Sequence, residues 1–456
     1  MRIVKYIQML HATLDAKRLI APLALILAVS MLVAQPAKMQ QGETDTDVIT
    51  LNSQPYIPGQ VIVQLNSGFS IGTVAMIYGL DPVPIDQIQT GLPLATNYQM
   101  RIIDGSTVEQ KVADLVADVV RIALAEPNYN YTAPEAARPT WSVGDSFASI
   151  AAGRKFYNSQ WARGRIRLDE AHIVTRGATS TVPPVPVIIA VLDTGIDLNH
   201  PAFSGRLVPG YDFVGNDTDP SEEGSTQTGP YGHGTLVAGL IAMVAPEAKI
   251  MPIRVLGADG RGNFYSLAKA IKYALDNGAD VINLSLSTPS SSKLISDVFY
   301  AELDRDTDPL GSMPGAVVIA AAGNSGTEVR EYPAAVDEDP TRVPRRGRCV
   351  LSVAASNGDD VLSVFSTHGS WVSVMAPGER IIGPVPFNRY GVWAGTSMAS
   401  PLVAGEVALV RAANPAAAAR DVVTHIKNHS VAVPGQQIRI DAALAVSTLI
   451  PTIDKR

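Results

Sequence analysis

Near the start of the chain, two different hydrophobic patterns follow each other. Residues 56–65, YIPGQVIVQL, alternate apolar and polar side chains, which predicts a half-buried strand. Residues 107–127, TVEQKVADLVADVVRIALAEP, repeat apolar side chains at helical spacing, which predicts an amphipathic helix. The proline-bounded PNYNYTAP, residues 127–134, then predicts extended chain. Together these patterns predict a small α+β unit over residues 56–131.

From residue 160 onward, apolar runs alternate with helical patterns. The helical patterns cover residues 233–245 and 264–280. The apolar runs are the kind that buried parallel strands require, and they are VPVIIAVLD (185–193), AKIMPIRVL (248–256), VINLSLS (281–287), GAVVIAAAGN (315–324) and CVLSVAAS (349–356). This alternation predicts a three-layer α/β domain, with a mainly parallel central sheet covered by helices on both faces. Functional groups in such a domain gather beyond the carboxyl ends of the strands.

The N-terminus reads as an export signal. Lys17 and Arg18 precede a mostly apolar run at residues 19–34, which is short for a membrane span of about 20 residues. We therefore predict a signal peptide over residues 1–37, a linker over 38–55, and a secreted or extracytoplasmic protein. Two alternatives are a membrane anchor through residues 19–34, if the signal is retained, and a buried core helix. The core helix is disfavoured by the basic residues in front of it.

Composition narrows the functional classes. The chain has 456 residues, of which 46% are hydrophobic and 17% charged, so it can build a large core. Its net charge of −7 argues against a nucleic-acid partner. Cys349 is the single cysteine, which excludes an intramolecular disulfide and a cysteine-based zinc site.

Four polar residues stand at predicted element boundaries, each beside glycine or other small residues. Asp193 follows a strand, His233 opens a helix, Asn324 follows another strand and Ser397 opens a later helix. Taken alone, each is more often a helix cap or a turn residue. Taken jointly, Asp193, His233 and Ser397 follow one of the known chain orders of a catalytic triad.

The segments around these residues resemble the signatures of the subtilisin-like serine endopeptidases, the subtilases or peptidase S8 family. The matching segments are VLDTGID, GHGTLVAG, AAAGNSG and GTSMASP. The resemblance implies a subtilisin-like catalytic domain over residues 157–446, followed by a tail over 447–456. It also implies that the 56–131 unit, which closes with EPNYNY, is an N-terminal propeptide. Residues 132–156 would then be a linker with a processing site.

The resemblance and the chemistry assign the same roles to these residues. Ser397 would attack the scissile carbonyl to form an acyl-enzyme, and His233 would take its proton and deliver it to the leaving amine. Asp193 would hold the imidazole tautomer. The oxyanion would be held by the Asn324 side chain and the backbone N–H of Ser397, at the start of a helix. This chemistry needs no cofactor.

The resemblance also implies a cleft that binds peptide as an added strand. Ser285, Leu286 and Ser287 would line one side of the primary pocket, and the segment 320–323, which ends in Ala322 and Gly323, would line the other. Gly260 and Gly262 would pair with the substrate backbone. Two departures from the family pattern stand out: Ser287 replaces the usual glycine, and Leu236 replaces a common histidine outside the triad. The expected partners are protein or peptide substrates and the chain's own propeptide, with the enzyme acting as a monomer.

One acidic loop is a candidate site for a structural calcium ion. Asp212, Asp217 and Asp219 offer three carboxylates in one loop, a plausible calcium site, although a solvated acidic loop explains them equally well.

A catalytically inactive relative that only binds protein segments is disfavoured by the complete triad and Asn324. A lipase-like α/β-hydrolase is disfavoured because its elbow needs G-x-S-x-G and its serine comes first.

Overall fold

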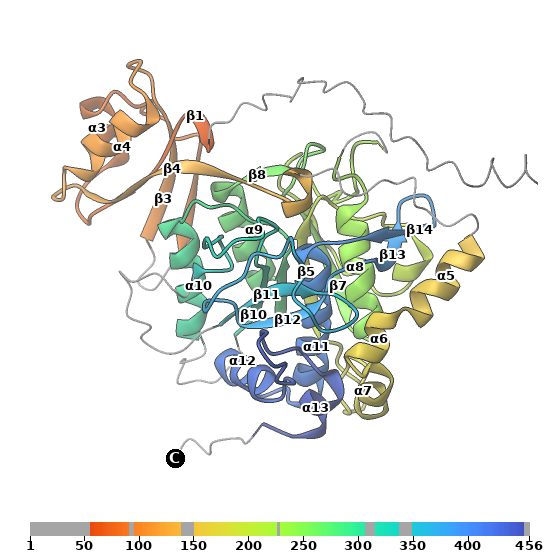
Figure 1. Cartoon of the computed structure of the whole chain (residues 1–456). Coiled ribbons are helices and arrows are strands. Elements are labelled where there is room, and N and C mark those ends of the chain that lie inside the picture. Colours follow the sequence, from red (N-terminus) through yellow and green to blue (C-terminus); the bar gives the residue numbers. More distant parts are fainter. Residues whose placement is uncertain are drawn as a thin grey trace, which may run out of the picture. The chain divides into compact units, whose positions relative to one another are not determined.

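The computed structural model describes residues 55–90, 95–137, 150–225, 229–305, 315–336 and 349–450 (Figure 1). These residues belong to one compact unit, Gln54–Arg456. The predicted signal peptide at residues 1–37 and most of the tail predicted at 447–456 lie outside the described residues. Within the described ranges, no helix combines the length and the apolar character that crossing a membrane requires.

The N-terminal part forms a small antiparallel sheet with two helices and its own hydrophobic core. The four strands are ordered β2-β3-β1-β4, and β8 of the following domain extends the sheet at β4. The elements are β1 (Tyr56–Leu65), α3 (Ile71–Ile77), β2 (Asp86–Thr90), β3 (Ala95–Arg101), α4 (Val108–Val116) and β4 (Ile122–Thr132). The short 3₁₀ helix η1 (Pro134–Ala137) follows β4.

The helix predicted over residues 107–127 is much shorter in the structure. It ends at Val116, and Val119 and Val120 are 76% and 66% exposed instead of continuing the apolar face. The Asn66 side chain donates to the carbonyls of both valines at 3.0 Å, which holds the turn. From Ile122 onward the backbone forms strand β4, antiparallel to β1. The prediction was wrong here because pairing with a distant strand overrode the local helical pattern.

The remainder of the chain is built on a seven-stranded sheet in which every pairing is parallel. The strand order is β12-β11-β10-β9-β5-β7-β6. The strands are β5 (Ile188–Asp193), β6 (Tyr211–Asp212), β7 (Lys249–Arg254), β9 (Val281–Leu284), β10 (Val317–Ala321), β11 (Val350–Ser356) and β12 (Val374–Pro377). The predicted α/β class with a mainly parallel central sheet is confirmed.

Helices cover both faces of this sheet, and a hairpin of β13 (Ile381–Val385) and β14 (Arg389–Trp393) lies apart from it (Figure 1). Two further short elements are η3 (Pro201–Phe203) and β8 (Arg261–Asn263). The helices are α5 (Ile150–Ser159), α6 (Trp161–Arg165), α7 (Leu168–Val174), α8 (His233–Val244), α9 (Phe264–Asp276), α10 (Lys293–Arg305), α11 (Thr396–Ala413), α12 (Ala419–Asn428) and α13 (Ala442–Ser447). Helix α5 therefore begins inside the segment that the sequence analysis assigned to the linker.

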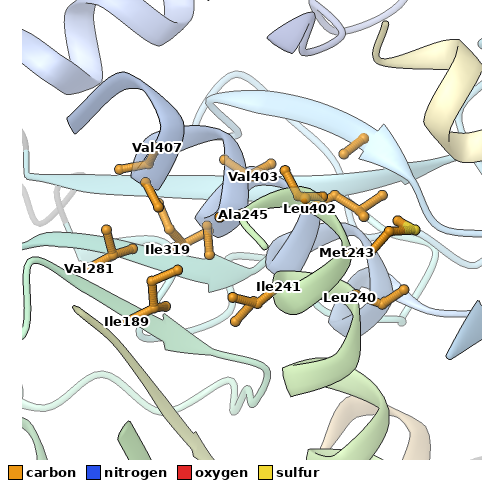
Figure 2. Close-up of a cluster of buried hydrophobic side chains, with 14 of the residues drawn as sticks. Ile189, Leu240, Ile241, Met243, Ala245, Val281, Ile319, Leu402, Val403 and Val407 are labelled. Carbon is orange, nitrogen blue, oxygen red and sulfur yellow. The ribbon is translucent and has the colours of Figure 1, made fainter. Parts of the chain in front are cut away.

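Two separate cores lie on the two faces of the sheet, because successive strand side chains point to opposite faces. In β5, Ile189 and Val191 belong to the core shared with α8 and α11. Ala190 and Leu192 belong to the core shared with α9 and α10. Figure 2 shows the first core, where side chains of three neighbouring strands meet those of α8 and α11. Burial on both faces explains why these strands read as continuous apolar runs.

Helices α8 and α11 pack closely against each other, and every residue of α8 is buried. Gly405 of α11 allows this contact. A Cβ atom at Gly405 would overlap the side chain of Val244, with 2.7 Å to its Cγ1 atom. Both helices carry candidate functional residues at their N-termini, so their packing sets the position of those residues.

We expect Gly405→Ala to lower the free energy of unfolding by about 1–3 kcal/mol, because the added methyl group must push α11 away from Val244. Gly164→Ala is the matched control. It also lies in a helix, but a Cβ there meets nothing within 4 Å, so it should stabilise the protein by roughly 0.5–1 kcal/mol. Urea denaturation of both variants measures the difference. Equal stability of Gly405→Ala and the original protein would contradict the close packing at this glycine.

Candidate functional site

Asp193 is the last residue of β5, which lies between β9 and β7 in the parallel sheet. Its side chain therefore sits at the carboxyl edge of the strands, where the sequence analysis placed it. The residue is completely buried, and its Oδ1 atom accepts the backbone N–H of Thr194 at 2.7 Å. This bond fixes the orientation of the carboxylate inside the protein.

His233 begins α8 and lies directly beside Asp193. Gly232 precedes it with a φ of 92°, a conformation that glycine adopts far more readily than other residues. A Cβ atom on Gly234 would lie 3.1 Å from Cβ of Asp193, so the first turn of α8 rests on the turn after β5. As a result, Nδ1 of His233 lies 2.7 Å from Oδ1 of Asp193.

Ser397 and Asn324 approach from the other side of the site. Ser397 is the second residue of α11 and is completely buried, and Asn324 follows β10. The Asn324 Oδ1 atom accepts both the backbone N–H and the hydroxyl of Thr396, each at 3.0 Å. These bonds leave the Nδ2 group of Asn324 pointing toward the start of α11. The four residues singled out from the sequence therefore converge at one place.

The carboxylate of Glu135, in η1 after strand β4, occupies the point where these groups converge. Its Oε2 atom accepts the Ser397 hydroxyl at 2.7 Å and lies 3.1 Å from Nε2 of His233. Its Oε1 atom accepts Nδ2 of Asn324 at 2.9 Å. The sequence analysis missed Glu135, because a single acidic residue in a proline-bounded segment carries no signal for this role.

The paired charges shift the ionisation of His233 and Glu135 in opposite directions. Burial by itself lowers the pKa of His233, but the carboxylates of Asp193 and Glu135 together raise it to about 10. Burial likewise opposes the ionisation of Glu135. The hydrogen bonds and the charge of His233 nevertheless hold the pKa of this carboxyl below its ordinary value. With Glu135 in place, His233 is therefore a cation at neutral pH and cannot accept a proton.

A second carboxylate that the sequence analysis missed, Glu222, links the turn after β5 to the start of α8. It accepts the Thr194 hydroxyl at 2.5 Å and the Gly232 backbone N–H at 2.7 Å, and it also contacts the Thr235 hydroxyl. Burial is the main cause that raises the pKa of Glu222 to about 7. This carboxyl group holds the residues next to Asp193 and next to His233 in a fixed relation.

The end of strand β4 lies between two segments that the sequence analysis assigned to the substrate cleft. Tyr131 pairs with Gly262, and the Ala133 N–H donates to the Gly260 carbonyl at 3.0 Å. On the opposite side, Thr132 and Ser287 exchange two backbone hydrogen bonds of 3.1 and 2.9 Å. The chain thus lies as an added strand between these segments, with Glu135 following it.

The other predicted pocket residues lie close to this strand and to the start of α11. The Ser285 hydroxyl donates to the Ser397 carbonyl at 3.1 Å. Leu286 and Ala322 are completely buried, and the Gly323 N–H donates to the Thr396 hydroxyl at 3.1 Å. The segments 285–287 and 322–324 therefore both border the site that contains Ser397.

The three carboxylates predicted to bind calcium do not form a cation site in the structure. Asp212 already has a cationic partner, because its Oδ2 atom lies 2.7 Å from a guanidinium nitrogen of the buried Arg254. Its Oδ1 atom accepts two backbone N–H groups. Asp217 and Asp219 each accept a backbone N–H two residues further on. In the part of the chain that the structure describes, no group of three or more His, Cys, Asp or Glu residues could hold a metal ion.

The model of the subtilase family, Peptidase_S8, matches residues 186–443. A thermophilic serine proteinase from Bacillus sp. (strain AK1) is 32% identical over 78% of this chain and 78% of its own length. Thermitase from Thermoactinomyces vulgaris is 37% identical over 56% of this chain and 83% of its own. The crystal structure of fervidolysin from Fervidobacterium pennivorans superposes with a TM-score of 0.66. That likeness has 24% identity and covers 88% of this chain and 62% of fervidolysin, so it supports the fold.

We expect Asp219→Asn to leave any response of the melting temperature to calcium or EDTA unchanged, because Asp219 accepts the backbone N–H of Ser221 and belongs to no metal-binding group among the described residues. Arg254→Met should instead lower the free energy of unfolding by about 3–5 kcal/mol, because it leaves the buried Asp212 carboxylate unpaired. Thermal unfolding with and without calcium measures both effects. If calcium stabilises the original protein but not Asp219→Asn, the loop is a cation site after all.

Proposed function

We propose that Asp193, His233 and Ser397 form the catalytic triad of this chain. The proposal proceeds from the family, because the chain belongs to the subtilase family of serine endopeptidases. Ser397 attacks the carbonyl carbon of the scissile peptide while His233 accepts its proton, and the acyl-enzyme forms when His233 returns that proton to the leaving amine. Asp193 holds the Nδ1–H tautomer and stabilises the imidazolium. Water then hydrolyses the acyl-enzyme by the same proton route.

The observation that carries this proposal is the position of the Glu135 carboxylate. One carboxylate oxygen accepts a hydrogen bond from the side-chain amide of Asn324, as the oxyanion of a tetrahedral intermediate would. The other is shared by the Ser397 hydroxyl and the imidazole of His233. A planar group with two oxygens is thus held where nucleophile, base and oxyanion donor all reach it. We propose that the carbonyl group of a substrate takes the same place, aided by the N–H of Ser397 at the start of α11.

We further propose that the enzyme is made as a zymogen in which residues 56–131 and Glu135 act as an intramolecular inhibitor. Strand β4 fills the cleft in the extended form that a substrate would adopt. A side-chain carboxylate, and not a peptide carbonyl, faces Ser397, so the chain is bound without being cut. Maturation then requires Glu135 to leave and a bond between about Tyr131 and Lys155 to be cleaved by Ser397.

The basic residues and apolar run of the N-terminus support secretion, and we propose that residues 1–37 direct export. The paired Lys17 and Arg18 precede residues 19–34, whose length suits a signal peptide. The substrates proposed for the exported enzyme are proteins and peptides that can enter the cleft as an extended strand.

In Ser397→Ala, hydrolysis of peptides should fall by several orders of magnitude, and the protein should remain at precursor size. The original protein should appear in the medium as a shorter chain whose first residue, found by N-terminal sequencing, lies between Tyr131 and Lys155. It should also react with a fluorophosphonate and cleave casein. Ser447→Ala, at an exposed serine whose hydroxyl donates to Leu444, is the matched control and should mature normally. A protein that binds casein without labelling or cleavage would be the inactive relative, and normal maturation of Ser397→Ala would refute self-processing.

The pH dependence of maturation tests the role of Glu135. The pKa of His233 is raised from 6.5 to about 10. The stabilisation that the His233 imidazolium contributes to its contact with Glu135 is therefore fully present below pH 6.5 and is lost as the pH rises through about 10. The pKa of Glu135 is lowered from 4.5. The stabilisation that this carboxylate contributes to the contact is therefore present above pH 4.5 and is lost as the pH falls through the lowered pKa. Self-processing should therefore accelerate from pH 7 toward pH 10.

Glu135→Gln removes the negative charge but keeps an amide of the same shape. We expect its processing to reach half of the maximal rate at a lower pH than in the original protein, because His233 loses one of the two carboxylates that raise its pKa. Asp114→Asn, at an exposed position of α4 in the same propeptide unit, is the matched control and should leave the profile unchanged. The rate of conversion, followed by gel electrophoresis from pH 5 to 10, decides the outcome. Identical profiles for Glu135→Gln and the original protein would exclude this role of Glu135.

A further inference from the structure

A third carboxylate, Glu331, lies beside the predicted primary pocket and has no part in the proposed mechanism. Glu331 stands in the loop that follows β10, and its side chain is buried, with 9% of the residue exposed. The next residue, Tyr332, exchanges two backbone hydrogen bonds with Thr288. This pairing ties the loop to the segment that continues from β9 past Ser287.

The carboxylate fills the space between the two segments that border the pocket. Strands β9 and β10 are paired as far as Leu284 and Ala320, and the chain continues beyond them as 285–287 and 322–324. Oε2 of Glu331 accepts the Ser287 hydroxyl at 2.6 Å. A Cβ atom on Gly323 would overlap the same carboxylate, so only glycine leaves room for it there. Glu331 therefore touches both sides of the pocket.

This position lies next to the reaction site. Ser287 pairs with Thr132 of the strand that lies in the cleft, and Gly323 precedes Asn324, whose amide holds the carboxylate of Glu135. A substrate whose carbonyl takes that place must send the side chain of the same residue into the space between 285–287 and 322–324. Glu331 is therefore positioned to contact the side chain before the scissile bond.

Within the residues that the structure describes, the two hydrogen-bond partners of the Glu331 carboxylate are neutral hydroxyl groups. The second is the Thr367 hydroxyl, which donates to Oε1 at 2.9 Å. Among the described residues, no lysine, arginine or histidine forms an ion pair with this carboxylate. A buried carboxylate that has only hydroxyl partners gains much from the approach of a cation, because the interior screens the attraction weakly.

We propose that Glu331 makes this peptidase select lysine or arginine as the residue whose carbonyl is attacked. The proposal rests on the proposed function, because it assigns specificity to the same site. It also narrows the self-processing position. In residues 131–155 the basic side chains are Arg138, Arg154 and Lys155. A cut after Arg138 or Arg154 places the first residue of the mature chain inside the proposed window, at Pro139 or Lys155. Arg154 and Lys155 lie on helix α5, which must unwind before it can enter the cleft as a strand.

The test compares two peptides that differ only in this residue, lysine in one and leucine in the other. The mature original protein should cleave the lysine peptide with the higher kcat/KM. Glu331→Gln keeps the shape of the side chain, with one acceptor oxygen and an NH₂ group that can donate to the other hydroxyl. In this variant kcat/KM for the lysine peptide should fall on the order of 100-fold, whereas the value for the leucine peptide should not fall. Glu328→Gln, an exposed carboxylate in the same loop, is the matched control and should retain the preference for lysine.

Active-site labelling with a fluorophosphonate is measured in parallel on each variant. If the original protein is labelled and cleaves the two peptides with the same kcat/KM, Glu331 does not select a basic side chain and this inference is wrong. The same conclusion follows if Glu331→Gln is labelled normally and keeps the preference for lysine. If the original protein is not labelled and cleaves neither peptide, the proposed function itself fails.

Discussion

The burial of one parallel sheet on both faces is the constraint on which the remainder of the structure depends. Because each strand of β5, β9 and β10 must run in the same direction, their carboxyl ends meet at one edge. That edge carries Asp193, the segment 285–287 and Asn324. The two helices that supply His233 and Ser397 cover the same face, and their contact at Gly405 leaves little freedom in where their first turns lie. The site is thus set by the packing of the core.

Small residues bring these groups within bonding distance. Gly234 lets α8 rest against the turn that carries Asp193, and Gly323 leaves space for the carboxylate of Glu331. In both places a side chain would have to displace a neighbouring group. The small residues around the candidate site are therefore explained by close approach, and the rigidity of the surrounding core keeps the resulting geometry fixed.

Buried carboxylates have different partners in this charge-poor protein, and the partner decides what each can do. Asp212 faces the guanidinium of Arg254 and stabilises a loop. Glu135 faces an imidazolium, so its contact depends on pH. Glu222 receives hydroxyl and backbone donors that join two segments, and Glu331 receives two hydroxyl groups beside the pocket. The cost of burying an unpaired charge makes these differences consequential for binding and for stability.

The sequence by itself determined the features that depend on local pattern. Apolar runs and helical spacing predicted the parallel sheet and its helices, and four short motifs indicated the family and the residues around Ser397. It failed where a distant partner decided the outcome. Helix α4 ends at Val116, and the chain turns so that strand β4, from Ile122 onward, can pair with β1. Glu135 meets Ser397 across 262 positions of the chain, and the Asp212 carboxylate pairs with Arg254 from the neighbouring strand β7. No local pattern encodes such contacts, because they arise only when the packed core brings remote segments together.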